Sequence, residues 1–173
     1  MKIFHTSILI IFLFTTNVAI PEQKIAFINM DKVISTSNSG SSILKQLMDL
    51  NKKNLKFLKN EEKKFKEMET KLISQKNIIS KSEFKIEFEE LKAEIKIYNQ
   101  NRNQIIEEFN KTKVTNTNHF LKLINPILVK FSNDKEISII LQKKDLVVGK
   151  TELDITDEII KIANIELKEF KIK

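Results

Sequence analysis

The stretch KIAFINMDKVIS, Lys24–Ser35, decides how the rest of the chain is interpreted. Within it, Ile25–Ile28 is a continuous apolar run that is too short for the core of a helix and is bounded by polar residues. Such a run is typical of a buried β-strand. Because the backbone N–H and C=O groups of a strand need partners, the rest of its sheet must come from another part of the chain.

The partners are predicted near the C-terminus, in two further β-rich runs. Glu136–Leu141 and Leu146–Val148 are separated by four polar residues, and Gly149 follows the second run. We interpret the two runs as a β-hairpin that pairs with the first strand, although its turn lacks the favoured Asn-Gly chemistry. The predicted core and oligomer contact of this sheet contains Ile25, Phe27, Ile28, Ile137, Ile139, Leu141 and Val147.

A long helical region separates the two ends. The 85 residues between Gly40 and Pro126 contain no Gly or Pro and are rich in Glu, Lys, Leu, Ile and Phe, which is typical of a long helix or coiled coil. One uninterrupted helix would be ~130 Å long. The apolar pattern lapses after Ile73, and Ser80–Glu83 then matches the S-x-x-E capping box of a new helix. We therefore predict two helices joined by a turn.

Apolar residues recur at spacings of mostly three, four or seven on both predicted helices, which favours an antiparallel, left-handed pair. Polar residues interrupt this seam, so the pair is expected to bend and splay. The pattern resumes over Phe120–Phe131, where Pro126 predicts a kink or a helix restart with Asn125 as a cap. The predicted seam contains Leu44, Met48, Leu55, Leu58, Phe65, Met68 and Leu72, followed by Phe84, Phe88, Leu91, Ile95, Tyr98, Ile105 and Phe109.

These elements predict a mainly α-helical fold with a small β body. A long antiparallel helical hairpin, the arm, is inserted between the first strand and a C-terminal β-hairpin plus helix, the helix being expected over Glu158–Lys168 after a cap at Asp154–Asp157. A body of about 60 residues has little core of its own, so we expect it to self-associate with the arms projecting. The predicted boundaries are 1–19 for a removed leader, 22–40 and 132–173 for the oligomerisation body, and 41–131 for the arm with its tip near 74–82.

The leader has the features of a secretory signal peptide. Lys2 precedes the apolar run Ile8–Phe14, and small and polar residues follow. A retained membrane anchor is the alternative, but the run is shorter than the roughly 20 apolar residues that span a bilayer. We therefore expect the chain to be exported and the leader to be cleaved.

The composition leaves few options for catalysis. The chain has no Cys, which excludes disulfides and thiolate chemistry, and it has two His, of which His119 has no carboxylate close to it in sequence. With two Gly there is no Gly-rich phosphate loop. We expect no enzyme activity, no cofactor and no metal.

The net charge of +7 is concentrated in the middle of the chain. Residues 41–131 hold 19 Lys and Arg against 12 Asp and Glu, whereas the remaining mature segments are close to neutral. We interpret this as a diffuse field that attracts acidic partners; a solvated basic face without a partner is the alternative. The densest part, with one aromatic residue off the main stripe, is the predicted client-binding surface: Lys52, Lys53, Lys56, Phe57, Lys59, Lys63, Lys64 and Lys66.

Taken together, the mature chain resembles the periplasmic Skp/OmpH chaperones. The resemblance rests on Lys24–Val33 (KIAFINMDKV), the Ser39–Ser41 link, the long charged hairpin, Ile137–Gly149 (ISIILQKKDLVVG) and the closing Leu153–Lys161 (LDITDEIIK). It implies a periplasmic homotrimer whose bodies form a joint β-structure. The arms would then enclose a cavity that holds unfolded outer-membrane proteins without ATP.

Two other functions fit parts of the pattern. A coiled-coil structural or tethering protein of the cell envelope would share the arm, but the interrupted seam and the basic arm favour a chaperone. Nucleic-acid binding fits a pI of about 9.4, but export and interleaved acidic residues argue against it. The expected partners are unfolded outer-membrane proteins and copies of the chain itself, with weak contact to an anionic membrane surface and no specific nucleic acid.

Overall fold

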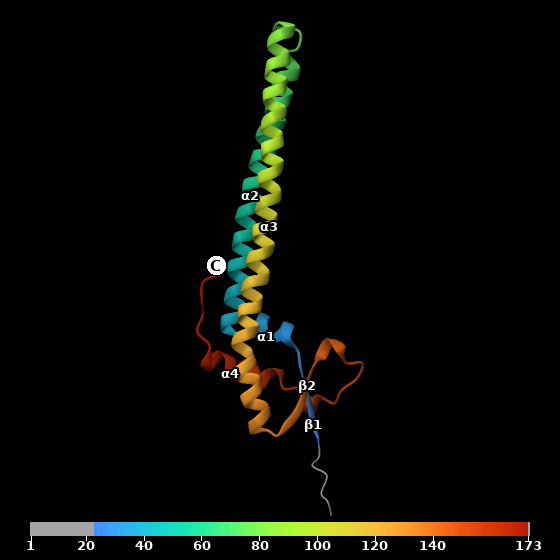
Figure 1. Cartoon of the computed structure of the whole chain (residues 1–173), viewed down its shortest axis with the longest axis vertical. Helices are drawn as coiled ribbons and strands as arrows, with labels where there is room; N and C mark the ends of the chain where they lie inside the picture. Colours follow the sequence, from blue (N-terminus) through green and yellow to red (C-terminus); the bar gives the residue numbers. More distant parts are fainter. Residues whose placement is uncertain (1–22, 173) are drawn as a thin grey trace, which may run out of the picture.

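In a computed structural model, which describes residues 23–172, the chain forms a long two-helix arm that rises from a small base (Figure 1). The signal peptide predicted for residues 1–19 lies outside the described residues. The elements are β1 Lys24–Ile28, α1 Met30–Thr36, α2 Asn38–Gln75, α3 Lys81–Asp134, β2 Ile137–Gln142, the 3₁₀ turns η1 Lys143–Asp145 and η2 Thr151–Leu153, and α4 Thr156–Glu166.

The two strands are parallel neighbours in one sheet. Ile25 pairs with Ile139 and Phe27 with Leu141, so the predicted pairing of the N-terminal strand with the strand after Glu136 is confirmed. Because parallel neighbours cannot be joined by a tight turn, the chain has to cross back before the second strand, and α1 to α3 form this crossover. The whole arm is therefore part of the connection between the strands.

The predicted β-hairpin is wrong in its second half. Leu146–Val148 is not a strand, and the sheet of the described residues has two strands, β1 and β2. The turn sequence QKKD lacks the Gly or Asn that favours a tight hairpin. The chain instead folds over the outer face of the sheet, where Gly149 and Lys143 lie against the Phe27 ring. The free edge of β1 is met by Asp154 in an isolated parallel bridge.

A tight corner joins α1 to α2. Ser37 ends α1 and caps α2, and its hydroxyl accepts a hydrogen bond from Gly40 N at 3.3 Å. A Cβ at position 40 would lie 2.2 Å from the main-chain oxygen of Ile34, so the close approach of the two helices requires glycine. The Ser39–Ser41 segment, predicted as a link, is the first turn of α2.

The arm turns at residues 76–80, within the predicted tip. The capping box is present: Glu83 N donates to the Ser80 hydroxyl at 3.2 Å, and Ser80 N donates to the Glu83 carboxylate at 3.0 Å. The predicted restart at Pro126 is wrong, because α3 continues through it and Asn125 lies inside the helix rather than at a cap. A proline inside a helix removes one backbone hydrogen bond and crowds the carbonyl four residues earlier, at a cost of about 3 kcal/mol. Burial of the neighbouring Ile124 and Ile127 in the core offsets this cost.

The predicted seam of α2 is shifted by one residue near the base. There α2 buries Ile43 and Leu47, while Met48 is 65% exposed and Leu44 is also on the surface. Both stripes have helical spacing, but the base of α2 has to cover the core of the body as well as α3. Farther along the arm, Leu58 and Leu72 of α2 and Leu91 of α3 are buried as predicted. Three other predicted seam residues are exposed instead: Leu55, Met68 and Phe88.

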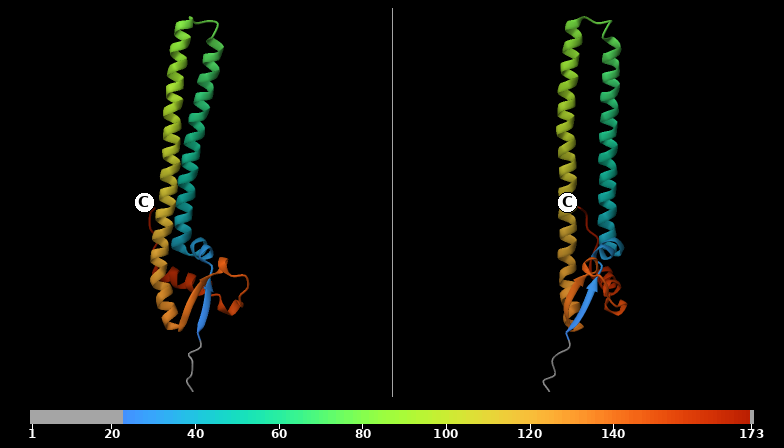
Figure 2. Two further views of the ribbon diagram at one scale, coloured as in Figure 1. Left: turned by 45° about the vertical axis from the view of Figure 1, so that its right-hand side comes forward. Right: turned by 90° about the vertical axis from the view of Figure 1, so that its right-hand side faces the viewer.

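The core lies where the arm enters the base (Figure 2). It contains Ile28 of β1, Val33 of α1, Ile43 of α2, and Phe120 of α3, together with Ile159 of α4. Helix α4 starts two residues before the predicted Glu158 and lies beside the lower part of α3, where it covers this core. All layers of the base therefore share one small apolar cluster.

Asp154 fixes the start of α4. Its carboxylate accepts hydrogen bonds from Thr156 N at 3.1 Å and Lys143 Nζ at 2.8 Å, and the Thr156 hydroxyl accepts from Asn29 N at 2.9 Å. Burial raises the pKa of Asp154, but the hydrogen bonds from Lys143 and Thr156 together outweigh it and hold that pKa below its ordinary value of 3.8. This network ties the end of β1 to the beginning of α4.

The Gly40→Ala variant should be less stable by about 1–3 kcal/mol, because the added methyl group meets the main chain of Ile34 rather than a movable side chain. The free energy of unfolding in urea, followed by circular dichroism, measures the change. Lys45→Ala, at an exposed position of the same helix, is the control. Equal stability of the two variants would contradict the close packing of this corner.

The Asp154→Asn variant should lose about 1 kcal/mol of stability at neutral pH, a low value because the Lys143 amine is half exposed. Since folding lowers the pKa of Asp154, its contribution is complete above about pH 5 and is lost as the pH falls through the folded-state value. The stability difference between wild type and variant should therefore shrink from about pH 5 to pH 2, as measured by urea unfolding. A difference that stays constant would show that the charge of Asp154 has no such role.

Candidate functional site

The predicted client-binding lysines all lie exposed on α2, between Lys52 and Lys66. Two of them are engaged within the helix, because Lys63 pairs with Glu67 at 3.6 Å and Lys64 pairs with Glu61. No ion pair within residues 23–172 involves the other members, Lys52, Lys53, Lys56, Lys59 and Lys66.

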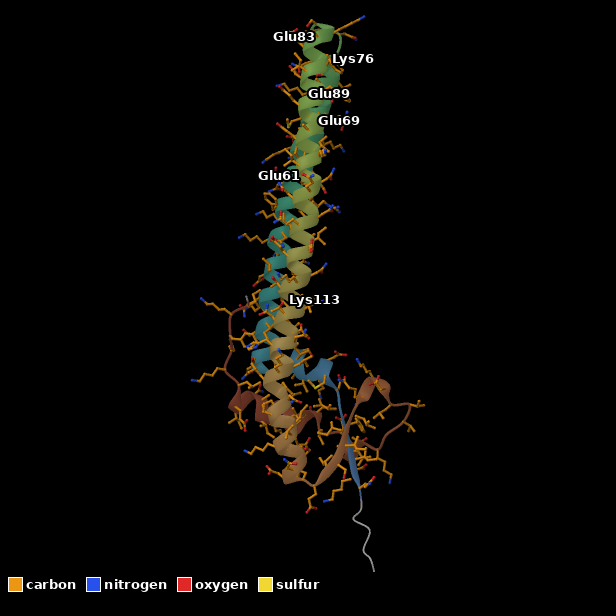
Figure 3. All side chains as sticks on the ribbon, in the orientation of Figure 1. Glu61, Glu69, Lys76, Glu83, Glu89 and Lys113 are labelled. Atoms are coloured by element: carbon orange, nitrogen blue, oxygen red, sulfur yellow. The ribbon has the colours of Figure 1, made fainter. Side chains whose placement is uncertain are left out.

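The four lysines nearest the base, Lys52, Lys53, Lys56 and Lys59, are named the basic stretch. No acidic residue lies between Asp49 and Glu61, so this part of α2 is entirely positive. Figure 3 labels Glu61 partway up the arm, beyond which acidic side chains such as Glu69 and Glu89 alternate with lysines. The structure thus narrows the predicted basic surface to a segment of about three helical turns.

Phe57, the aromatic member of the predicted set, is 50% exposed and lies four residues from Lys53. Residues four apart occupy the same face of a helix, one turn from each other. An apolar ring and an unpaired ammonium group are therefore neighbours on the arm surface. Such a pair can contact both the apolar and the acidic side chains of an extended polypeptide.

An apolar groove lies near the arm tip, with a volume of about 270 Å³. The rings of Phe84 and Phe88 stack along it with centroids 6.4 Å apart, and Phe88 is 48% exposed although it was predicted to be a seam residue. The space corresponds to one large side chain rather than to a drug-sized ligand. The groove is lined by Glu69, Leu72, Ile73, Phe84, Phe88, Leu91, Lys92 and Ile95.

One polar residue of the seam, Glu62, has a hydrogen-bond partner on the facing helix. The Tyr98 hydroxyl lies 3.0 Å from a Glu62 carboxylate oxygen and 3.3 Å from the Leu58 carbonyl oxygen, and its ring packs against Phe65 at 5.3 Å. Burial and the negative charge of Glu62 raise the pKa of Tyr98, which keeps the hydroxyl protonated as a donor. Glu62, a polar residue at an otherwise apolar seam position of the sequence, thus accepts a hydrogen bond from the facing helix.

The predicted core of the sheet is divided between its two faces. Ile28 is buried against the helices, and Phe27 is buried under the loop after β2, whereas Ile137 is partly buried. A groove of about 400 Å³ runs between α3 and β2 beside this sheet. Three of the other predicted members lie exposed on the strands and are named the exposed sheet residues: Ile25, Ile139 and Leu141. The fourth, Val147, is exposed in the loop after β2.

No metal-binding cluster is found among residues 23–172. No three His, Asp or Glu side chains gather closely enough there to hold a metal ion. His119 is on the surface and packs edge-on against the Phe170 ring at 4.8 Å. Within the same residues no helix has the length and apolarity needed to span a bilayer.

Two features of the site were not predicted from the sequence. One is the open groove at the arm tip, which the regular spacing of Phe84 and Phe88 concealed. The other is the segment Leu167–Ile172 after α4, which returns to the arm and contacts Gln46 and His119. Its alternating apolar residues, Phe170 and Ile172, were the available signal.

Comparison with known proteins gives a consistent result. A crystal structure of a candidate OmpH-like outer membrane chaperone from Caulobacter crescentus CB15 has the same fold, with a TM-score of 0.77 at 13% sequence identity over 87% of this chain and 89% of that chain. No curated protein sequence is significantly similar. The sequence profile of the family described as "Outer membrane protein (OmpH-like)" matches residues 24–162. The chain belongs to the OmpH-like family of outer membrane proteins.

Proposed function

We propose that the protein is a periplasmic holdase chaperone, which binds unfolded outer-membrane β-barrel proteins without ATP and prevents their aggregation. Membership of the OmpH-like family and the chaperone description of the Caulobacter protein support this role. The observation that carries it is the arm surface, where the unpaired basic stretch lies beside exposed apolar side chains. We also infer that the chain is not an enzyme and that residues 1–19 direct export.

The physical basis is weak attachment at many points. A positive arm attracts acidic segments over about 8 Å at physiological salt. Exposed apolar side chains of the arm, among them Phe57, Phe88, Ile97 and Ile106, then offer separate small contacts. A fully buried apolar side chain contributes roughly 1.5–3 kcal/mol, so a partly covered one contributes less. An unfolded chain can therefore be retained by several contacts without being trapped by any one of them.

We infer further that the protein self-associates through its base, as a homotrimer if it follows the resemblance to Skp/OmpH chaperones. Segments 22–40 and 132–173 would then be the oligomerisation body. Segment 41–131 would be the arm, and the arms of the associated chains would together enclose a cavity for the client. The exposed sheet residues and the groove beside β2 support this, because they leave an apolar surface on a base with a small core. The same positive charge also favours weak contact with an anionic membrane surface.

The holdase role is tested by diluting a urea-unfolded outer-membrane β-barrel protein with and without the mature protein and measuring turbidity. The wild type should suppress aggregation. Changing the four lysines of the basic stretch to Gln should weaken client binding roughly tenfold, since exposed charges contribute on the order of 0.3 kcal/mol each. The difference should fall when salt rises from about 0.05 to 0.5 M.

The matched control replaces Lys85, Lys111, Lys113 and Lys130 of α3 with Gln. It removes the same net charge from a different part of the chain, where all four side chains are also exposed. An equal loss of client binding in both variants would assign the effect to total charge alone. If adding the wild-type protein left the turbidity of the diluted client unchanged, the holdase proposal would be removed.

Self-association is tested by measuring the mass of the intact mature protein under native conditions. The expected mass is that of three chains. Replacing Ile139 and Leu141 with Ser should shift the assembly to monomers, because both side chains are exposed on the isolated chain. Met48→Ser, which removes an exposed apolar group from the arm, should leave the mass unchanged. A monomeric wild type would overturn the inference.

A further inference from the structure

The segment Leu167–Ile172, named the tail, leaves α4 and runs back along the base of the arm beside α2 (Figure 1). It lies beyond residues 24–162, where the OmpH-like profile matches. The tail has no helix or strand assignment, yet Leu167, Phe170 and Ile172 are all partly buried against the main core. The tail is therefore a docked, extended segment rather than a free end.

Docking uses the main chain of the tail. Gln46 Nε2 donates to Phe170 O at 2.9 Å, and Gln46 Oε1 accepts from Ile172 N at 3.2 Å. One amide group thus pairs with the C=O and N–H that flank Lys171, in the way that one residue of a β-strand pairs with a parallel neighbour. Gln46 Nε2 also donates to Ser42 O at 3.3 Å, which fixes the orientation of the amide. These two hydrogen bonds can form with any extended main chain, whereas the side chains of the bound segment add contacts of their own.

The side chains of the tail occupy only part of the site. The Phe170 ring meets His119 edge-on at 4.8 Å, a favourable aromatic geometry. Beside this contact a cavity of about 590 Å³ remains open, so the groove has room for bulkier residues than those of the tail. The cavity is lined by Thr115, Asn116, Asn118, His119 and Lys122 of α3, with Phe170 and Lys171 of the tail.

The tail has the chemistry expected of a client. Phe170 and Ile172 alternate with Lys171, and an extended segment with alternating apolar and polar residues is the pattern of a transmembrane β-barrel strand. The same groove can therefore accept an extended segment of an unfolded barrel protein through the amide of Gln46 and the ring of His119.

We propose that the groove formed by Gln46 and His119 at the base of the arm is a sequence-tolerant binding site for extended polypeptide with alternating apolar residues, and that the tail occupies it as an intramolecular competitor. The identity of the competing ligand as a client rests on the proposed function. The site itself rests on the two hydrogen bonds and the ring contact that hold the tail.

The covalent link between the tail and α4 determines how strongly the tail competes for the groove. A segment held by a short linker has an effective concentration on the order of millimolar. If the free tail peptide binds with a Kd on the order of 0.1 mM, the attached tail lowers the apparent affinity for any competing peptide roughly tenfold. The competitor thus tunes binding without abolishing it.

Two variants of the full mature chain separate release of the tail from loss of the groove. The double variant Phe170→Ser with Ile172→Ser releases the tail and keeps Gln46. The variant Gln46→Met also releases the tail, because its thioether has no donor for Phe170 O and is only a weak acceptor for Ile172 N. Amide hydrogen exchange of the C-terminal residues should rise in both, which verifies release.

The probe is a fluorescein-labelled peptide with the sequence of Glu166–Lys173, and fluorescence anisotropy measures its binding. We expect the double variant to bind it roughly tenfold more tightly than the wild type does, and Gln46→Met to bind it no better than the wild type. A peptide with the sequence of an outer-membrane barrel strand should compete with it. A peptide with Ser in place of Phe170 and Ile172 should not.

The turbidity assay with the unfolded barrel protein then connects the groove to the client. The double variant should hold the client more tightly than the wild type, and Gln46→Met should not. Equal peptide binding by the two variants, or weaker client binding after release of the tail, would overturn the proposal. Peptide binding as expected with no suppression of aggregation by any form would remove the holdase role and leave the groove as a peptide site.

Discussion

Parallel pairing of β1 with β2 is the constraint on which the rest of the structure depends. Parallel strands need a connection that returns the chain to the same end of the sheet. Here that connection has grown into an arm, since α2 and α3 leave the base and come back to it before β2 begins. The arm can vary in length without disturbing the sheet, provided that its two helices stay paired where they enter the core.

The small base explains why so many polar contacts gather there. Both strands and the four helices α1 to α4 contribute to one apolar cluster, which is little for an independent domain. The hydrogen bond from Asn29 N to the Thr156 hydroxyl joins positions that are 127 residues apart in sequence, and the Asp154 carboxylate holds Thr156 in place from the same turn. The arm needs fewer such contacts because its seam is long and each turn adds the same kind of packing.

Much of the fold could be predicted from sequence because the relevant signals are local. The isolated run Ile25–Ile28 identifies β1, and the Ser80–Glu83 capping box locates the end of the tip. Prediction failed where two local patterns compete. Ile43 with Leu47 and Leu44 with Met48 are equally good stripes, and only the position of the body decides between them. The residues Leu146–Val148 have strand propensity, but burying Phe27 draws them across the sheet.

The candidate site was harder to predict than the fold. Exposure of the basic stretch follows from its position off the seam, whereas its lack of ion pairs depends on rotamers that the sequence does not specify. The tail is so short that its alternation of apolar residues does not by itself indicate docking, and Gln46 is not part of a recognisable sequence motif. Docking of the tail requires the C-terminal end of α4 to lie close to the Gln46 side chain of α2, and the two come together only in the folded base.

The separation of the paired strands also has a kinetic consequence. Lys24 and Glu136, which form an ion pair beside the sheet, are 112 positions apart in sequence. Closing a loop of that length costs entropy, and contacts of high sequence separation slow folding. Once α2 and α3 have zipped from the tip, however, the ends of the loop are brought together by the helices themselves. We therefore expect the hairpin to form first and the sheet last, so that β1 of a nascent chain would stay an unpaired edge until the arm is complete.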